Sequence, residues 1–491
     1  MNRAVTVVIG HCLVAAVALA EVSQPTGKKQ RRWDSALGPD PIPEYEVVVD
    51  GRKIDLLPVQ MKFCEGGAQP IRDWGGVYWA ASFPYRPGAI VCVKSLTVPL
   101  DEAVLTPKGR IREMKRSGDY EISFSSPRPF RTVLEREKRV KPLMLFGNAA
   151  ETDTPDFSGP NIIRFGPGKH KVDKVMLTDN QTLYLDYGAI LYGGVMAKGT
   201  NITVRGHGVI SGAVYPRMRG PCGHPLSGRH CRGLTVRDIT ITASWSWTFV
   251  LHGCDGVTVD NIRILGSRMI NDDAIDIVNS RNVTIRNSFV RAQDDLFALK
   301  GHDREKNTPV DGILIEECDL WCDRANIFRV GYESDASGMG NITGRNLEIL
   351  HVSSEHAPFE SAWPHALFWL QPSGGLRQGD MTFENIKVNL DGYDTHLVIA
   401  NPRVLPWGRP RYTTGGSISN VVFRNISVSG CGLSHCPSVL QGRNESETVS
   451  DIRFENVRIF GKTLTASSPD VRIGEFASGI SFASPQGKAR K

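Results

Sequence analysis

Residues 269–300 read MINDDAIDIVNSRNVTIRNSFVRAQDDLFALK and contain two pairs of adjacent aspartates, Asp272 with Asp273 and Asp294 with Asp295. Between the pairs, apolar and polar residues alternate over residues 282–287, the pattern of a strand that buries one face. Asp294 follows Asp273 by 21 positions, and an interval of this order recurs, loosely, through most of the chain. If the interval is one coil of a solenoid, the two pairs lie above one another.

The recurring unit is a short segment in which apolar and polar residues alternate and which usually ends in Asn. It occurs at residues 234–238, 257–261, 283–287, 313–317, 342–346, 381–385, 421–425 and 452–456, with starts 23 to 40 residues apart. One short strand per repeat, without a helical pattern between repeats, favours a right-handed parallel β-helix over leucine-rich repeats. A β-sandwich or a propeller is the alternative, but propeller blades need close hairpins and a steadier period. The wider intervals then measure loops inserted between strands.

The chain divides into five parts by composition. Residues 1–20 are apolar after Arg3 and end in small residues, which predicts a signal peptide, and a polar tether follows to about residue 40. Residues 41–150 contain short alternating segments, such as 45–49 and 120–124, that predict a small β-sandwich. We expect the β-helix over residues 156–465 and a C-terminal tail over residues 466–491.

Composition and charge exclude several classes of function. The chain has 491 residues, 49 Gly, 29 Pro and a formal net charge of +6. The basic run at residues 28–32 has no nucleic-acid-binding motif beside it, so we expect no nucleic-acid partner. No stretch after the signal peptide is apolar enough to cross a bilayer, so we expect a secreted, monomeric protein, extracellular or periplasmic, with no membrane partner.

Cysteines are candidates for disulfides in an exported protein. Three pairs are close enough in sequence to be bonded: Cys222 with Cys231, Cys318 with Cys322, and Cys431 with Cys436. Their spacings do not form a zinc motif, because no Cys-x-x-Cys pair is matched by a second one.

The stacked aspartates suit acid–base chemistry. Equivalent residues of neighbouring coils lie about 4.8 Å apart, so the carboxylates of Asp273, Asp294 and Asp295 should converge. Crowded or buried carboxyl groups have raised pKa values, as a general acid requires. The alternatives are solvated turn aspartates or a calcium site. Apolar neighbours such as Ile275 and Leu296 put the acids at strand ends and favour a catalytic cluster.

These motifs resemble those of a known group of enzymes. Residues 271–276, NDDAID, followed one coil later by residues 293–296, QDDL, resemble the N-x-D and D-D signatures of the pectinase-type β-helix glycoside hydrolases. These are family 28, the polygalacturonases, and its relative family 49, the dextranases and isopullulanases. Residues 165–168 and 187–193 are similar to the start of the β-helix in these enzymes. An N-terminal β-sandwich and residues 321–332 resemble family 49 in particular.

The resemblance implies hydrolysis of a glycosidic bond with inversion. Asp294 would protonate the leaving oxygen, while Asp273 and Asp295 would hold and deprotonate the attacking water. No cofactor and no metal is needed for this reaction. The substrate would be a polysaccharide or an oligosaccharide.

Departures from the polygalacturonase pattern bear on the substrate. That pattern has Gly-His-Gly one coil beyond the aspartate pair and a later Arg-x-Lys that receives the substrate carboxylate. Here the two regions read Arg-Ala-Asn-Ile at 324–327 and Ala-Leu-Phe-Trp-Leu at 366–370. We therefore expect a neutral, α-linked glycan, with a pectin-type hydrolase as the alternative.

Residues near the aspartates are candidates for binding the sugar. Aromatic faces suit the apolar face of a pyranose, so Trp245, Trp247, Trp363 and Trp369 are candidates as a group, with Trp245 as its representative. The other substrate-binding candidates are Asn271, Lys300, His302, Arg329 and Tyr332. Lys300, His302 and Arg329 could also contact a charged sugar.

Two other functions fit the same fold. A polysaccharide lyase or epimerase would use a basic residue beside a uronate carboxylate, often with calcium. A non-catalytic carbohydrate-binding or adhesive β-helix would need no clustered carboxylates.

Overall fold

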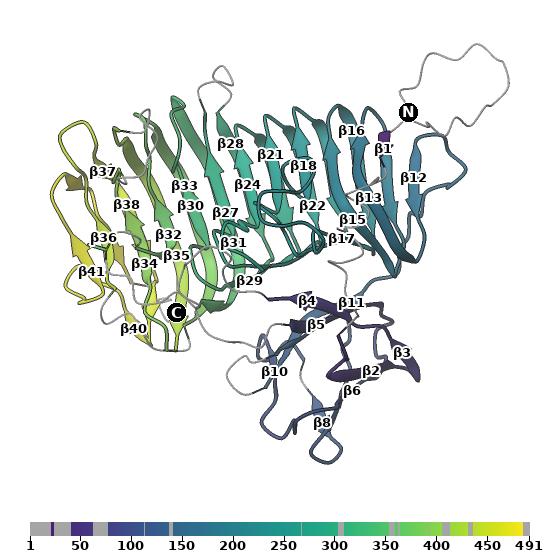
Figure 1. Ribbon diagram of the computed structural model, residues 1–491. Helices are drawn as coiled ribbons and strands as arrows, with labels where there is room; N and C mark the ends of the chain where they lie inside the picture. The colour runs from purple at the N-terminus through teal and green to yellow at the C-terminus, as the bar shows by residue number, and fades with distance from the viewer. Residues whose placement is uncertain are drawn as a thin grey trace, which may run out of the picture.

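The computed structural model describes residues 21–23, 41–61, 77–111, 113–136, 141–266, 268–302, 309–352, 359–361, 364–390, 392–404, 413–430 and 436–484. All of its regular elements are strands. They form a long right-handed parallel β-helix with a small β-sandwich against one side, beneath the N-terminal half of the helix in Figure 1. Both parts of the predicted fold are therefore confirmed.

The β-helix has three columns of strands, in which each strand pairs with its equivalent one coil away. The first column contains β12 (Ile162–Phe165), β14 (Thr182–Leu185), β16 (Thr200–Gly206), β19 (Arg232–Arg237), β22 (Asp255–Asp260), β25 (Arg281–Arg286), β28 (Val310–Glu316), the first parts of β31 (Gly338–Val352), β33 (Arg377–Asn389) and β35 (Ser417–Ser429), then β37 (Val449–Ser450), β38 (Ile452–Glu455), β42 (Ala477–Ser478) and β43 (Ser481–Ala483).

The second column follows the first after a short turn. It contains β13 (Gly168–Leu177), β15 (Ala189–Ala197), β17 (Val209–Ser211), β20 (Thr240–Thr242), β23 (Arg263–Leu265), β26 (Phe289–Ala292), β29 (Asp319–Cys322), the second parts of β31, β33 and β35, and β39 (Arg458–Ile459), to which β40 (Lys462–Thr463) adds an antiparallel partner.

The third column carries the candidate site, and we call it the site column. After the second parts of β13 and β15 it contains β18 (Leu226–Arg229), β21 (Phe249–His252), β24 (Ile275–Val278), β27 (Phe297–Lys300), β30 (Phe328–Val330), β32 (Ala366–Leu370), β34 (His396–Ala400), β36 (Ser438–Leu440) and β41 (Val471–Ile473).

The register confirms the repeat found in the sequence. Leu234 pairs with Val257 and Val257 with Val283. The same row continues through the first residue of every predicted unit and ends where Val421 pairs with Ile452. All eight alternating segments therefore lie in the first column, and the variable intervals between them reflect loops outside the strands.

Asparagines close many of the turns. In the last coils the Nδ2 atom of Asn456 donates to Asn425, that of Asn425 to Asn385, and that of Asn385 to Asn346, over 2.9 to 3.1 Å. These four residues have φ between 52° and 56°, a left-handed conformation that Asn tolerates better than most residues. We call this row the asparagine ladder. It satisfies polar groups of the turn from one coil to the next.

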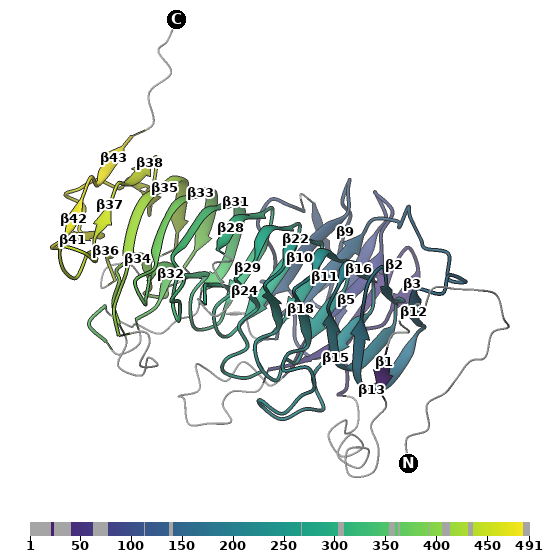
Figure 2. The ribbon, with the colours of Figure 1, turned by 90° about the horizontal axis from the view of Figure 1, so that it is seen from above.

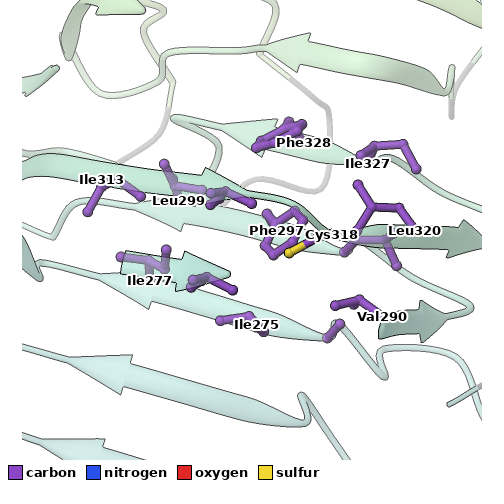
Figure 3. Close-up of a cluster of buried hydrophobic side chains, with 14 of the residues drawn as sticks. Ile275, Ile277, Val290, Phe297, Leu299, Ile313, Cys318, Leu320, Ile327 and Phe328 are labelled. Atoms are coloured by element: carbon purple, nitrogen blue, oxygen red, sulfur yellow. The ribbon is translucent and has the colours of Figure 1, made fainter. Parts of the chain in front are cut away.

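The interior of the β-helix is apolar throughout. Figure 3 shows Ile275 and Ile277 of β24, with Phe297 and Leu299 of β27, pointing into this core. Because side chains alternate along a strand, the residue between each pair points outward. Asp276 therefore belongs to the outer face of the site column, as do Ala298, Arg329 and Trp369, its partners in register.

Both ends of the β-helix differ from the sequence expectation. β41, β42 and β43 pair in parallel with β36, β37 and β38, so the expected tail after residue 465 is part of the last coil up to Ala483. At the other end, β1 (Glu21–Ser23) pairs antiparallel with β13, inside the segment expected as a tether. The signal peptide predicted at residues 1–20 lies outside the described residues.

The β-sandwich has two five-stranded sheets. One contains β4 (Leu57–Gln60), β5 (Val77–Pro84), β11 (Leu143–Asn148), β10 (Phe130–Glu135) and β7 (Val104–Thr106), and the other β3 (Arg52–Ile54), β2 (Tyr45–Val49), β6 (Val91–Ser95), β9 (Glu121–Phe124) and β8 (Met114–Arg116). The segments predicted as strands at 45–49 and 120–124 are β2 and β9.

The sandwich is joined to the second column of the β-helix. Figure 1 shows β4, β5 and β11 on the side that faces the coils, and in the view of Figure 2 β5, β10 and β11 overlap the coils around β16, β18 and β22. Asp319 of β29 is buried and accepts hydrogen bonds from Arg110 at 2.5 and 2.7 Å and from Arg131 at 3.0 Å. Trp321, Phe289 and the sandwich's Phe146 share one apolar cluster beside these ion pairs. These contacts of the described residues join the sandwich to the second column.

The predicted disulfides are not formed where both partners can be followed. Cys318 and Cys322 are buried thiols, and so is Cys231, which excludes its bond with Cys222. Cys318 lies directly before β29 and Cys322 ends it, so the extended strand keeps them about 13 Å apart although both thiols face the core. Cys431 lies outside the described residues. In the part of the chain that the structure describes, no helix could span a membrane.

Candidate active site

The two aspartate pairs lie directly before β24 and β27, at the start of the site column. The Ala274 N–H donates to the Asp295 carbonyl oxygen at 2.9 Å, so Asp273 and Asp295 occupy the same level in neighbouring coils. The predicted stacking of Asp273 with the second pair is therefore present. The chain is irregular at both pairs, which allows consecutive aspartates to serve different purposes.

Asp272 holds the turn together. Its Oδ1 atom accepts hydrogen bonds from the Gln293 N–H at 2.8 Å and the Asp294 N–H at 3.1 Å. The side chain is completely buried. It thereby joins one coil to the next and fixes the position of the Asp294 backbone.

Asp294 is the most accessible aspartate of the cluster. Its Oδ2 atom accepts from the Asn271 N–H at 3.2 Å and its Oδ1 atom from the Asp295 N–H at 3.1 Å. Asn271 has φ 61°, and its side-chain oxygen accepts a hydrogen bond from Arg217. Asn271 therefore positions Asp294 through its backbone.

Asp295 is held by the following coil. Asn326 donates to its Oδ1 atom from Nδ2 at 2.6 Å and from the backbone N–H at 3.3 Å. The Asn326 Oδ1 atom in turn accepts from the Ala366 N–H at 2.8 Å, which fixes the orientation of the amide. Asn326 occupies the region where the resemblance would place Gly-His-Gly. The contact of Asn326 with Asp295 was not predicted, because the sequence showed only that this region lacks the basic residue of the polygalacturonase pattern.

Lys300 bridges three carboxylates. Its Nζ atom lies 3.0 Å from Asp276, 3.5 Å from Glu333 and 3.9 Å from Asp273. The same atom is 3.6 Å from the centre of the Trp247 ring, a cation–π contact. Its charge is thus neutralised within the site, which makes Lys300 a positioning residue for the acids. Lys300 was predicted from the sequence as a site residue, but Asp276 and Glu333 were not.

Burial and mutual repulsion raise the pKa values of these acids. Burial, then the charges of Asp276 and Asp294, raise the pKa of Asp273 well above its ordinary value. Burial and Asp294 raise the pKa of Asp295 to about 6, although Arg329 opposes them. Burial raises the pKa of Asp276 to about 7 against the charge of Lys300. Burial opposes the charge on Lys300, but the surrounding carboxylates hold its pKa above the ordinary value. Near neutral pH the cluster therefore contains both protonated and ionised carboxyl groups.

Asp273 has an oxygen available for a ligand. Its Oδ1 atom is buried and has no hydrogen-bond partner among the described residues. A buried carboxylate oxygen without a partner is costly. A water molecule held there would satisfy it and would lie at the level of Asp295.

Arg329 lies on the same outer face, one coil beyond Ala298 of β27. Its guanidinium carbon is 3.7 Å from the Trp369 ring centre and 4.3 Å from that of Tyr332. Burial lowers its pKa, against the attraction of Asp295. No carboxylate of the described residues lies within ion-pair distance of it. Arg329 and Tyr332 are thus brought to the cluster as predicted.

The prediction for Trp245 is wrong. Its side chain has 0% exposure, packs against Tyr215 and Met269 in an apolar cluster, and donates from Nε1 to the Gly223 carbonyl at 3.0 Å. It has no face to offer a sugar. Trp247, which is partly exposed and lies on Lys300, is the tryptophan at the site.

The remaining candidates have other positions. The His302 N–H donates to Asn279 at 2.7 Å and its carbonyl accepts from the same side chain at 2.9 Å, so its backbone is part of a turn. Trp369 is 1% exposed, and Trp363 lies outside the described residues. Across the described ranges, no group of three or more His, Cys, Asp and Glu side chains is arranged to hold a metal ion.

Comparisons with known proteins agree with the resemblance found in the sequence. Residues 199–322, which include both aspartate pairs, match the family described as glycosyl hydrolases family 28. Exopolygalacturonase X-1 of Emericella nidulans is 24% identical over 311 residues, 59% of this chain and 64% of that protein. A polygalacturonase of Cochliobolus carbonum is 24% identical over 204 residues, 36% of this chain and 54% of that protein. The chain thus covers less than two-thirds of the length of these relatives.

The fold has a counterpart among solved structures. Dex49A from Penicillium minioluteum superimposes with a TM-score of 0.64, at 13% identity, over 89% of this chain and 94% of that one. At this identity the likeness concerns the fold. Together with the family match, it makes this chain similar to the pectinase-type parallel β-helix hydrolases.

Proposed function

We propose that this chain is a glycoside hydrolase that cleaves a polysaccharide or oligosaccharide with inversion, using Asp273, Asp294 and Asp295. The observation that carries the proposal is the convergence of these three carboxyl groups on the outer face of the site column. Raised pKa values of Asp273 and Asp295 support it, because a general base works best when its pKa lies near the operating pH.

In this mechanism Asp294 is the acid. It is the most exposed of the three, so the glycosidic oxygen can reach it, and its proton passes to that oxygen as the bond to the anomeric carbon breaks. A water molecule held by Asp273 and Asp295 attacks the anomeric carbon from the opposite face and gives its proton to one of these carboxylates. The new hydroxyl group then has the inverted configuration.

Lys300 supports the ionised form of the base. A carboxyl group can deprotonate the attacking water only when it is ionised. At least one of Asp273 and Asp295, whose pKa values are raised, must therefore be ionised. The positive charge of Lys300, 3.9 Å from Asp273, lowers the cost of that ionisation. Asn326 acts in the same direction on Asp295 through its two hydrogen bonds.

For the substrate, the first candidate is a neutral, α-linked glycan. Asn326 and Ala366 occupy regions where the resemblance would place basic residues, and Lys300 has its charge neutralised by three acids. A site of this composition supports recognition through hydroxyl groups and through the Trp247 ring.

An acidic glycan is the second candidate. Arg329 favours it, because this buried guanidinium beside Asp295 has no ion pair among the described residues and could receive a sugar carboxylate. The names of the polygalacturonase relatives agree with this candidate. Both candidates imply an exported enzyme, consistent with the signal peptide predicted at residues 1–20.

One experiment separates these possibilities. The purified protein is incubated with dextran, pullulan, polygalacturonate and arabinan, and product size and anomeric form are followed by NMR. Release of inverted reducing ends from one glycan supports the proposal and identifies the substrate. A rise in ultraviolet absorbance from an unsaturated product would indicate a lyase, and binding without release of reducing ends would indicate a carbohydrate-binding protein.

A further inference from the structure

A pocket of about 340 Å³ lies at the carboxyl ends of β34 and β36, away from the aspartate cluster. The residues that carry its chemistry are Phe359, Asn401, Arg403, Gln441, Arg443 and Glu475. β34 and β36 follow β27 by three and four strands in the site column. At about 4.8 Å per strand the pocket is roughly 15 to 20 Å along the helix axis from the cluster.

A continuous set of contacts leads from the cluster to this pocket. Arg329, which faces Asp295, packs on Trp369. Trp369 forms a small apolar cluster with Ala366 and Ile399, against which Phe359 also packs. The cluster and the pocket therefore belong to one face of the molecule, and a ligand lying along that face would reach both.

The walls of the pocket are held in place without a ligand. Arg403 donates to the carbonyl oxygens of Phe359 at 2.5 Å and Ser361 at 2.9 Å. Arg472 of β41 pairs with Glu360 at 2.6 Å and lies 5.0 Å from the Phe359 ring centre. Asn401 donates to the Gln441 carbonyl at 2.5 Å. Pre-organised walls reduce the conformational entropy lost on binding.

Charge in the pocket is only partly neutralised. Arg443 pairs with Glu447 at 2.6 Å. Arg403, by contrast, has no carboxylate within ion-pair distance in the described part of the chain. Aromatic, amide, guanidinium and carboxylate groups around one cavity form a set suited to a pyranose ring, which presents an apolar face and a rim of hydroxyl groups.

We propose that this pocket is a distal subsite that binds a further pyranose unit of the same glycan chain that the aspartate cluster cuts. The proposal rests on the function proposed above. Phe359 packs against the sugar ring, and Arg403, Gln441 and Arg443 donate hydrogen bonds to its hydroxyl or carboxylate oxygens. The subsite gives long substrates a higher kcat/KM than short ones, because only a long chain spans both the aspartate cluster and the pocket.

Chain-length dependence tests the subsite. We compare kcat/KM for a series of oligosaccharides of increasing length in the wild type, Phe359→Ala and Gln441→Ala. Both variants should lower the ratio of long-chain to short-chain kcat/KM about five- to tenfold, as expected for one lost aromatic or hydrogen-bonding contact. Gln441→Ala is included because it lies outside the apolar cluster that Phe359 helps to form. Phe460→Ala, which removes an exposed ring in the turn before β40, should keep the wild-type ratio.

Binding measurements separate this proposal from the catalytic one. In the Asp294→Asn background, titration calorimetry with the longest and shortest oligosaccharides should give tighter binding of the long chain, lost in Phe359→Ala and Gln441→Ala. Hydrolysis with an unchanged length ratio in both variants would overturn the subsite and leave the catalytic proposal intact. Length-dependent binding without hydrolysis would support the subsite and overturn the catalytic proposal. Titration with a neutral and with a uronate oligosaccharide series shows whether the pocket prefers hydroxyl or carboxylate oxygens. If neither series binds, the proposed subsite is overturned.

Discussion

Lys300 and Asp276 form a buried ion pair, with the Nζ atom 3.0 Å from Oδ1, on the outer face of the site column. Buried charges of this kind are costly unless several partners share them. Here the pair extends to Asp273, so Lys300 links the protonation of Asp276 to that of a catalytic candidate. This coupling leads to the first prediction.

Replacing Lys300 with Met should move the acidic limb of the pH–rate profile to higher pH. Without the cation, the pKa values of Asp273, Asp276 and Asp295 rise, and a higher pH is needed to ionise the base. A shift of about one pH unit corresponds to about 1.4 kcal/mol of lost charge interaction. The profile of kcat/KM measures it. Lys300→Arg should restore the profile in part, and Lys387→Met, which removes an exposed lysine, should leave it unchanged. An unshifted limb in Lys300→Met would contradict the role assigned to this residue.

Replacing Asp294 with Asn should reduce kcat by about 10² to 10⁴-fold, the usual contribution of a general acid. Asn cannot donate a carboxyl proton, and its single amide oxygen keeps one of the two hydrogen bonds that Asp294 accepts, from Asn271 or from Asp295. Circular dichroism and the unfolding temperature should therefore stay close to the wild type. The matched control is Asp101→Asn, an exposed acid of the sandwich. Full activity in Asp294→Asn would contradict the assignment of Asp294 as the general acid.

Replacing Asp273 with Asn should stabilise the protein at pH 8 but not at pH 4. The pKa of Asp273 is raised in the folded state, so the folded protein binds a proton that the unfolded chain releases between the two values. Stability is therefore fully present below the ordinary pKa of about 4 and falls as the pH rises towards the raised value. The variant lacks this loss, so its free energy of unfolding should exceed that of the wild type at pH 8 but not at pH 4.

The measurement is urea unfolding at both pH values. Asp101→Asn, which changes an acid in an exposed turn of the sandwich, serves as the control for a general effect of charge. A variant that is less stable than the wild type at pH 8 would indicate that ionised Asp273 contributes favourably to the fold.

Replacing Asp319 with Ala should weaken the attachment of the sandwich. Two partly exposed arginines would lose the buried carboxylate that they share, which should cost less than the about 3 to 5 kcal/mol of breaking a fully buried pair. We expect a lower unfolding temperature or a separate, earlier transition for the sandwich in calorimetry. Activity per folded molecule should be retained, because the sandwich contacts the second column and not the site column. Unchanged unfolding would show that the apolar cluster around Phe146 and Trp321 carries the attachment alone.

The architecture could be predicted because its signal is local and repeated. Alternating residues followed by Asn, from Leu234 to Ile452, determine both the direction of the side chains and the register between coils. The last coil was missed because β41 to β43 are short, half-exposed strands that do not repeat the unit. Trp245 and Trp247 are two residues apart in a loop, and no sequence pattern distinguishes the buried one from the one at the site.

Part of the site could have been found from the pattern. Asp276 stands between Ile275 and Ile277, whose alternation directs it to the outer face of the strand. Glu333 and Asn326 could not be found in this way. They reach Lys300 and Asp295 from neighbouring coils, and which loop residues meet depends on the path of the loop between strands.

The asparagine ladder has a consequence for how this protein can be produced. Asn425 of the ladder, and Asn201, Asn282 and Asn341 in other turns, begin Asn-x-Ser/Thr sequences, which are acceptors for N-linked glycans. Glycans are attached to the Nδ2 atom, and in these four residues that atom donates to the coil before. A sugar added there during synthesis in a eukaryotic host would replace one of the two Nδ2 hydrogens and place a bulky group at the turn before the coils stack, so the choice of host bears on how the solenoid forms.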